Sequence, residues 1–246
     1  MKALILAGGA GTRLRPITHT RAKQLVPVAN KPILFYGIEA MVAAGITEIG
    51  VIVGDTRVEV MAALGDGSQF GAAITYVPQD APLGLAHCVL IAREFLGDDD
   101  FVMYLGDNLL EQDLAAFVAA FEAARAGDEP PAAQILLKRV PDPGRYGVAE
   151  VSTDKKSVIS IVEKPKQPKS DYAVTGMYFY DASVFSVIKT LKPSGRGELE
   201  ITDVNNDYIR RKLMLWDELP GEWTDAGTFS SLLKANEIMA PVGDTE

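Results

Sequence analysis

A glycine-rich segment near the start of the chain has the composition of a phosphate-binding loop. Its sequence, AGGAGTRL, places Gly8, Gly9 and Gly11 directly after a short apolar run that is typical of a strand. Clustered glycines let backbone amides approach a phosphate without side chains in the way. Arg13 adds a guanidinium fork that matches phosphate oxygens, and Lys23 supplies a second cation further along. These residue types predict a site for a polyphosphate.

Two other glycine-rich motifs differ from this loop. A P-loop ends in Gly-Lys-Ser/Thr, and the loop has no such ending. A dinucleotide fingerprint needs a third glycine where Leu14 stands, and its helix opens at once, whereas Pro16 intervenes here. A tight turn after a buried strand would explain the glycines alone. Because Arg13 and Lys23 accompany them, phosphate binding is the preferred hypothesis.

Two aspartates could supply a metal site. Asp107 follows the apolar run FVMYL, which places it at the carboxyl edge of a sheet, where open α/β sheets bind ligands. Asp225 lies in the motif WTDAGT. Two carboxylates suit Mg²⁺, which takes a few protein oxygens and completes its shell with water and phosphate. The alternative is a helix cap for Asp107, and a cap or a turn for Asp225.

Strands and helices alternate in the first half, which predicts an α/β fold with a mostly parallel, Rossmann-like sheet flanked by helices. The strands expected there are Lys2–Leu6, Ile49–Val53, Ala73–Val77 and Phe101–Leu105, and the helices are Pro32–Ala44, Val58–Leu64, Leu85–Leu96 and Leu114–Arg125. The second half is richer in strands. Its strands are expected at Gln134–Arg139, Val148–Val151, Val158–Val162, Val174–Tyr180 and Leu213–Leu219, and its helices at Ser183–Leu191, Asp203–Lys212 and Phe229–Met239. The final residues, APVGDTE, are expected to form a frayed tail.

Length and composition narrow the class of protein. A chain of 246 residues that is 48% hydrophobic suits one α/β domain with a sizeable core. The net charge of −9 argues against nucleic-acid binding through a basic face. The sequence has no apolar run of membrane-spanning length and no leader pattern, and its single cysteine, Cys88, is read as a buried small side chain. A cytoplasmic protein with no nucleic-acid or membrane partner is therefore expected.

The motifs together resemble a known family. The runs LAGGAGTRLRPIT and AKQLVPVANKPI resemble the signature of sugar-nucleotide pyrophosphorylases, and QDAPLGLA, YLGDN, RYGV, VEKP, SDYAVTGMYFYD, RGELEITDVN and WTDAGT follow in the family order. The triplet from Lys23 to Leu25 is most similar to the glucose-1-phosphate thymidylyltransferase branch, whereas relatives that use GTP or CTP usually carry Pro-Lys-Pro there. The resemblance implies a nucleotide-diphospho-sugar transferase fold in a single domain, residues 1–246, with a nucleotide-binding half of about 1–127 and a sugar-binding half of about 128–246.

The resemblance also assigns residues to roles. It places the nucleotide against Leu6, Gly8, Gly9, Gly11, Thr12, Arg13, Lys23, Gln24, Gln79, Gly84 and Asp107. It places the sugar phosphate against Asn108, Tyr146, Gly147, Glu163, Lys164, Val174 and Arg196, with Mg²⁺ on Asp107 and Asp225. The catalytic cations would be Arg13, Lys23 and Lys164. From the residues alone, the alternative is that Glu163 and Lys164 form an exposed charged pair before a turn, which would contribute little energy.

The implied reaction condenses dTTP with glucose 1-phosphate to dTDP-glucose and pyrophosphate, by Mg²⁺-assisted in-line displacement, and would feed deoxysugar synthesis. A uridylyltransferase acting on the same sugar phosphate, or a non-catalytic sensor of nucleotide sugars, is the alternative. The family resemblance also implies a homo-oligomer, a tetramer or a dimer. The chain resembles a short form that stops soon after Met239, where longer members carry further helices that build subunit contacts and a feedback site.

Overall fold

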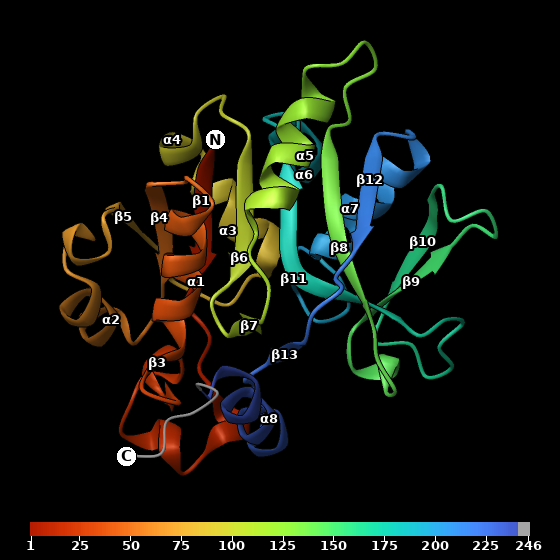
Figure 1. The fold of residues 1–246 in the computed structure, drawn as a ribbon. Helices are drawn as coiled ribbons and strands as arrows, with labels where there is room; N and C mark the ends of the chain where they lie inside the picture. Colours follow the sequence, from red (N-terminus) through yellow and green to blue (C-terminus); the bar gives the residue numbers. More distant parts are fainter. Residues whose placement is uncertain (241–246) are drawn as a thin grey trace. The chain divides into compact units, whose positions relative to one another are not determined.

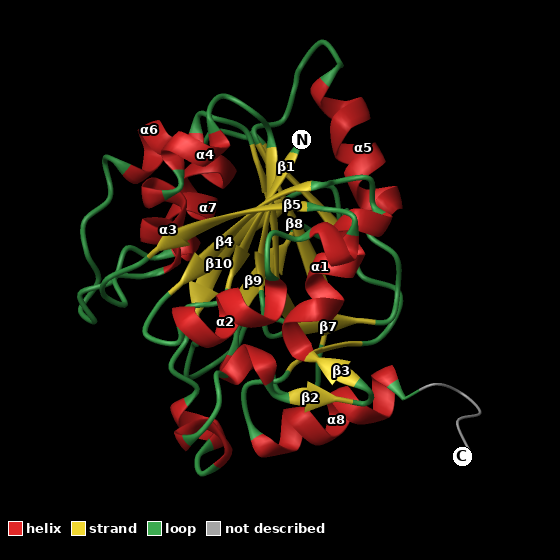
Figure 2. Ribbon diagram, turned by 90° about the vertical axis from the view of Figure 1, so that its left-hand side faces the viewer, coloured by secondary structure: helices red, strands yellow, loops and turns green. Residues whose placement is uncertain are grey.

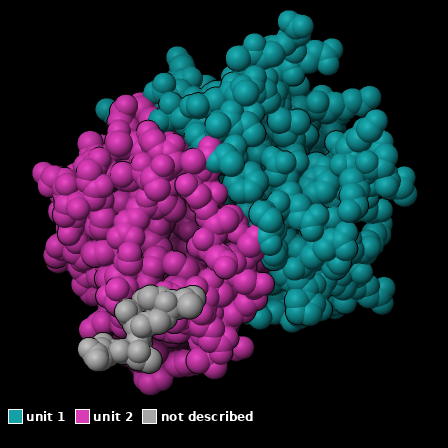
Figure 3. Space-filling view, viewed as in Figure 1, with its two compact units in different colours: residues 1, 83–103, 116–220 teal, residues 2–82, 104–115, 221–246 magenta. Residues whose placement is uncertain are grey.

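The computed structural model describes residues 1–240, in which the chain forms two compact units (Figure 3). Unit 1 contains Met1, Leu83–Met103 and Ala116–Pro220, and unit 2 contains Lys2–Pro82, Tyr104–Ala115 and the segment that begins at Gly221. Each unit is thus assembled from separate stretches of sequence. The prediction of a nucleotide-binding half and a sugar-binding half concerns what each half binds, and it stays a prediction. The expected tail after Ala240 lies outside the described residues.

Unit 2 is built on three parallel strands in the order β1 (Lys2–Leu6), β4 (Glu48–Val53) and β5 (Ala73–Pro78). Helix α1 (Ile33–Ala43) packs against β1, and α2 (Arg57–Leu64) follows β4 (Figure 1). α1 begins after a proline and ends before a glycine, as the sequence predicts. Three short 3₁₀ turns follow β1, and the small hairpin of β2 (Pro27–Val28) and β3 (Lys31–Pro32) precedes α1. That hairpin was not predicted from the sequence.

A second pair of short strands joins distant parts of the sequence in unit 2. β7 (Asn108–Leu110) runs antiparallel to β13 (Trp223–Asp225), with Asn108 opposite Asp225. The Trp223 indole N–H donates to the Asn108 side-chain oxygen at 2.7 Å, and both residues are buried. Because a strand follows Asp107, that residue does not cap a helix; likewise, the cap of α8 (Phe229–Met239) is Thr228, which exchanges hydrogen bonds with Ser231 in a capping box. The cap alternatives for both aspartates are therefore wrong.

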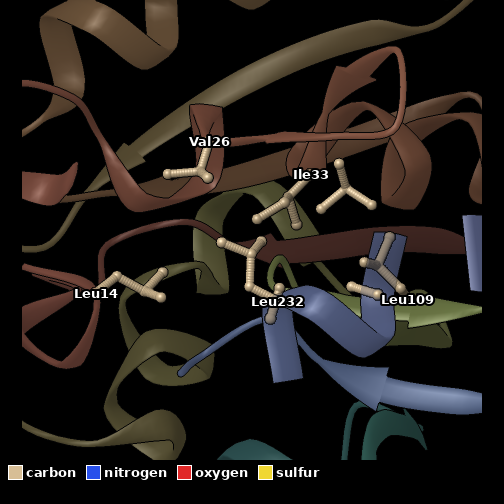
Figure 4. Close-up of a cluster of buried hydrophobic side chains, with 8 residues drawn as sticks. Leu14, Val26, Ile33, Leu109 and Leu232 are labelled. Carbon is tan, nitrogen blue, oxygen red and sulfur yellow. The ribbon is translucent and has the colours of Figure 1, made fainter. Parts of the chain in front are cut away.

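One apolar cluster in unit 2 joins the first part of the chain to the last helix. Leu14, Val26 and Ile33 from the first part of the chain pack with Leu109 and with Leu232 of α8 (Figure 4). All five side chains are buried. Burial of apolar surface is the main stabilising contribution here, and it fixes the glycine-rich loop through Leu14, which lies next to Arg13.

Unit 1 is built on a mostly antiparallel sheet. Its strands are β8 (Ala133–Arg139), β9 (Gly147–Val151), β10 (Val158–Glu163), β11 (Tyr172–Tyr180) and β12 (Met214–Glu218). β9 lies between β10 and β11, β8 pairs with β11, and the one parallel pair is β12 with β8. β6 (Phe101–Leu105) crosses the boundary between the units after Met103.

Four of the helices belong to unit 1 entirely, and α5 (Ala115–Arg125) begins at its boundary. α3 (Leu85–Ile91), α6 (Val184–Ile188) and α7 (Ile201–Arg210) pack together, as Figure 2 shows, while α4 (Arg93–Leu96) continues from α3. The predicted helix Leu85–Leu96 is therefore interrupted at Ala92. Among residues 1–240 no helix is long and apolar enough to cross a membrane. The α/β class is confirmed, with the parallel strands β1, β4 and β5 in unit 2 and mainly antiparallel strands in unit 1.

We expect the hydrogen bond between Trp223 and Asn108 to couple β13 to β7. Trp223→Phe and Asn108→Leu each remove it, and each should lower the free energy of unfolding by about 1–3 kcal/mol. Because both changes delete the same bond, the double variant should lose about 1 kcal/mol less than the sum of the single losses. Urea unfolding of the four proteins measures this coupling. Additive losses would show that the bond does not hold the two strands together.

Gly84 is expected to tolerate no side chain. Its φ is +104°, and a Cβ would lie 2.3 Å from the Leu199 carbonyl oxygen, a backbone atom that cannot move aside easily. Gly84→Ala should therefore combine backbone strain with overpacking and destabilise the protein by about 2–5 kcal/mol. Gly45→Ala is the matched control, since φ there is +84° but no atom lies within 4 Å of the added Cβ. Urea unfolding should give a loss of about 1 kcal/mol for the control; equal losses would exclude the close contact as the cause.

Candidate active site

The glycine-rich loop is packed against the lysine that follows it. Gly11 has a φ of +63°, and a Cβ there would lie 2.8 Å from the Lys23 Cβ. The Thr18 hydroxyl donates to the Gly11 carbonyl at 2.8 Å and closes the turn. Arg13 lies against Gly227, where an added Cβ would be 2.9 Å from the guanidinium and 3.4 Å from Asp225 Oδ2. The fold of unit 2 therefore places both predicted cations of the first loop beside the predicted metal ligands.

Lys23 is the buried cation of this group. Its side chain is only 9% exposed, and its ammonium donates a hydrogen bond to Asp107 in an ion pair. Burial raises the pKa of the Asp107 carboxyl, but the Lys23 charge and hydrogen bonds from Lys23 and Asn108 outweigh burial and hold that pKa below its ordinary value of 3.8. Asp107 is therefore an anion at neutral pH, which is the form that can bind a cation.

The β7–β13 pairing brings the two aspartates to one place. Asp225 stands opposite Asn108 in the ladder, and the Ala226 N–H donates to the Asp107 carbonyl at 2.8 Å. Asp225 Oδ1 is buried and has no hydrogen-bond partner among residues 1–240. A buried carboxylate oxygen without a donor costs free energy that a bound cation would recover. The two carboxylates therefore fit a hard divalent ion.

The two carboxylates suit a metal ion that is also coordinated by oxygens of a bound substrate. Within residues 1–240 no group of three or more His, Cys, Asp and Glu side chains converges. Mg²⁺ typically takes one or two carboxylates and keeps positions for phosphate oxygens and water. Asp107 and Asp225 would leave such positions open, and Arg13 and Lys23 stand beside them.

Only some of the residues predicted to bind the nucleotide base belong to unit 2. Gln24 is 3% exposed, and its Oε1 is buried with no partner within the described part of the chain. Gln79 lines a pocket of about 310 Å³ together with Gly54 and Asp80, and its Oε1 would lie 3.7 Å from a Cβ on Gly8. Gly84 belongs to unit 1, where its backbone packs on Leu199. An amide that still offers an acceptor suits recognition of a base edge.

Unit 1 gathers five of the predicted sugar-side residues. Gly147 pairs with Glu163 across β9 and β10, and the Lys164 N–H donates to the Tyr146 carbonyl at 3.0 Å. The Lys164 ammonium lies 3.0 Å from Glu163 Oε1. Val174 of β11 completes the group, since a Cβ on Gly147 would lie 3.6 Å from its Cβ and 3.4 Å from Glu163 Oε2.

Two predicted residues are held by other side chains. Arg196 donates to both carboxylate oxygens of Glu200, at 3.0 and 2.9 Å, and these hydrogen bonds raise its pKa. Asn108 is buried, and its side chain binds Trp223 and Asp107. Their proposed contacts with the sugar phosphate stay predictions.

One polar contact of this group was missed from the sequence. The Thr202 hydroxyl donates to Glu163 Oε2 at 3.2 Å, from the first turn of α7. The motif RGELEITDVN contains Thr202, but nothing in its spacing indicates which strand α7 would meet. That contact depends on tertiary structure.

Comparisons with known proteins identify the family. The model of a family described as nucleotidyl transferase matches residues 2–241. A glucose-1-phosphate thymidylyltransferase from Streptomyces griseus is 52% identical over 240 residues, which cover 97% of this chain and 66% of that protein. The chain thus spans about two thirds of the length of this curated relative.

Solved structures agree with this grouping. A crystal structure of a Bacillus anthracis protein, described as a candidate glucose-1-phosphate thymidylyltransferase in complex with sucrose, is 43% identical, with a TM-score of 0.92 over 100% of this chain and 98% of the other. A UDP-glucose pyrophosphorylase complexed with UDP-glucose is 24% identical, with a TM-score of 0.83 over 96% of this chain and 97% of the other, and shows a shared fold alone. The resemblance inferred from the ordered motifs is confirmed, and the chain belongs to the nucleotidyl transferase family.

Proposed function

We propose that this protein condenses dTTP with α-D-glucose 1-phosphate and releases pyrophosphate, forming dTDP-glucose. The observation that carries the proposal is the arrangement in unit 2, where the ladder of β7 and β13 sets Asp107 and Asp225 side by side with Lys23 and Arg13. Two anions and two cations at a glycine-rich loop suit a magnesium-bound triphosphate. The name of the relative that is 52% identical supports the same reaction.

The chemistry needs positioned charges more than a general base. The attacking oxygen belongs to the sugar phosphate and is already anionic at neutral pH, which fits a candidate site built without histidine. The barrier lies in bringing two polyanions together and in stabilising the charge that develops on pyrophosphate. Arg13 and Lys23 would stabilise the triphosphate, and Lys164 would bind the sugar phosphate. Bound Mg²⁺ supplies Lewis-acid polarisation of phosphate oxygens.

Two residues of unit 2 support a pyrimidine nucleotide. The side-chain amides of Gln24 and Gln79 can match the donor and acceptor groups of a thymine or uracil edge. The two bases differ only in the C5 methyl, which contributes modest discrimination. Selection of dTTP over UTP is therefore expected to be a preference.

The non-catalytic alternative is disfavoured by the residues that the chain keeps. A sensor of nucleotide sugars needs no metal ligands, yet Asp107 and Asp225 are both present, and Asp225 keeps a buried oxygen without a donor in the described structure. The oligomeric state and the cytoplasmic location expected from the sequence stay predictions.

Nucleotide choice is the first test of the proposal. Pyrophosphate release with glucose 1-phosphate should be fastest with dTTP, slower with UTP, and weak with ATP, GTP or CTP, the order that the name of the 52% identical relative suggests. Initial rates with each nucleotide at equal concentration, with a reaction lacking the sugar phosphate as the control, give the order. A purine nucleotide as the best substrate would refute the assignment.

The metal assignment predicts that Asp107→Ala and Asp225→Ala each lower turnover by roughly a hundredfold or more, because the remaining carboxylate holds the ion poorly. Binding of Mn²⁺, followed by electron paramagnetic resonance with dTTP present, should weaken in parallel. Asp98→Ala is the matched control, since that side chain is 87% exposed and pairs with Arg93. Normal Mn²⁺ binding in both site variants would exclude the two residues as metal ligands.

A further inference from the structure

β10 lies at the edge of the sheet, and a side chain forms hydrogen bonds with its backbone on the side that has no neighbouring strand. β10 ends the strand order of the sheet, with β9 on one side only. The Ile161 N–H donates to Asn206 Oδ1 at 2.9 Å, and Asn206 Nδ2 donates to the Ile161 carbonyl at 2.8 Å. In an antiparallel ladder alternate residues direct both backbone groups away from the partner, so one amide can satisfy both. Asn206 thus replaces one residue of an absent strand.

The helix that carries Asn206 is itself firmly anchored. The Tyr180 hydroxyl donates to Asn205 Oδ1 at 2.6 Å, and the Tyr208 ring stacks on Tyr180 with centroids 6.0 Å apart. Asn205, Tyr180 and Tyr208 are buried. α7 therefore offers a fixed support for the strand edge.

The bound strand leads directly to two predicted sugar-side residues. Glu163 and Lys164 follow Ile161 at the end of β10, and Thr202 binds Glu163 from the same face of α7 as Asn206. Lys164 has a φ of +43°, which a residue with a side chain adopts only where its surroundings impose it. Its N–H is held by Tyr146 on the β9 side, while Asn206 holds the strand on the other.

We propose that Asn206 is a positioning residue for the use of glucose 1-phosphate. It fixes the outer edge of β10 and so sets where Glu163 and Lys164 stand, without touching the substrate itself. The expected change in the KM for glucose 1-phosphate rests on the proposed function. The support of β10 by Asn206 does not depend on that function.

The kinetic test compares two asparagines whose amides bridge backbone groups. Asn206→Ala should raise the KM for glucose 1-phosphate about tenfold and leave the KM for dTTP within about twofold, because a small displacement of substrate-positioning groups costs binding. Asn236→Ala is the matched control: its amide accepts from the Ala29 N–H and donates to the Leu232 carbonyl, each at 2.8 Å, in unit 2. The control should leave both KM values unchanged. A KM for glucose 1-phosphate that stays normal in Asn206→Ala, or rises as much in the control, overturns the proposal.

A mutant cycle shows whether Asn206 acts through Glu163 and Lys164. In a background that carries both Glu163→Ala and Lys164→Ala, adding Asn206→Ala should change the KM for glucose 1-phosphate by less than about twofold, since both positioned groups are gone. A full tenfold effect in that background would mean that Asn206 acts by another route, and would overturn the proposed role.

Hydrogen exchange tests the same inference without activity. The amide of Ile161 should exchange at least about tenfold faster in Asn206→Ala than in the parent, with faster exchange extending to Lys164, because the edge bond that protects it is lost. Asn206→Ser, whose short hydroxyl cannot bridge both backbone groups, serves if the alanine variant fails to fold. Unchanged exchange over residues 161–164 overturns the inference whether or not the protein uses dTTP. A parent protein that exchanges as expected but makes no dTDP-glucose refutes the proposed function and leaves the strand support standing.

Discussion

The pairing of β7 with β13 is the constraint on which unit 2 depends. It joins residues separated by more than a hundred positions, and its register alone decides that Asp225 stands opposite Asn108, next to Asp107. The same pairing delivers α8 to the apolar cluster in which Leu14 and Leu232 meet. Leu14 in turn holds the loop that carries Arg13. The candidate metal site and the cations around it therefore share one support, and a slip of the ladder by one residue would turn the Asp225 side chain to the other face.

Helix α7 has a structural role in unit 1 that is comparable to that of the β7–β13 pairing in unit 2. Glu200 at its start binds Arg196, Thr202 binds Glu163, and Asn206 holds the backbone of β10. The first contact reaches the loop that carries Arg196, whereas the other two both reach β10. A single anchored helix thus holds one loop and one strand of the predicted sugar side in place. The two units therefore use different devices, a strand pair and a helix face, to arrange polar groups.

The sequence could predict what is local. The glycine loop, the three parallel strands of unit 2 (β1, β4 and β5) and the start of α1 follow from residue types and their spacing, and the ordered motifs indicated the family. The strands β2, β3, β7 and β13 are too short to show periodicity, so they were missed. Tertiary packing brings Asp107 next to Asp225 and makes the contacts of Thr202 and Asn206. A local sequence pattern cannot predict such long-range contacts. Asn206 reads in sequence as one more polar residue of an amphipathic helix.

The absence of a side chain at Gly84 has a consequence for protein engineering. Its backbone lies so close to Leu199 that glycine is required there before any nucleotide is considered. The Leu199 N–H donates to the Leu83 carbonyl at 2.8 Å, and the Ala86 N–H donates to the Leu199 carbonyl at 3.1 Å, so this segment is also tied by its main chain. A library that randomises position 84 to alter base selectivity would mostly sample destabilised chains. Diversity is better introduced at Gln79, whose side chain lines a pocket of about 310 Å³.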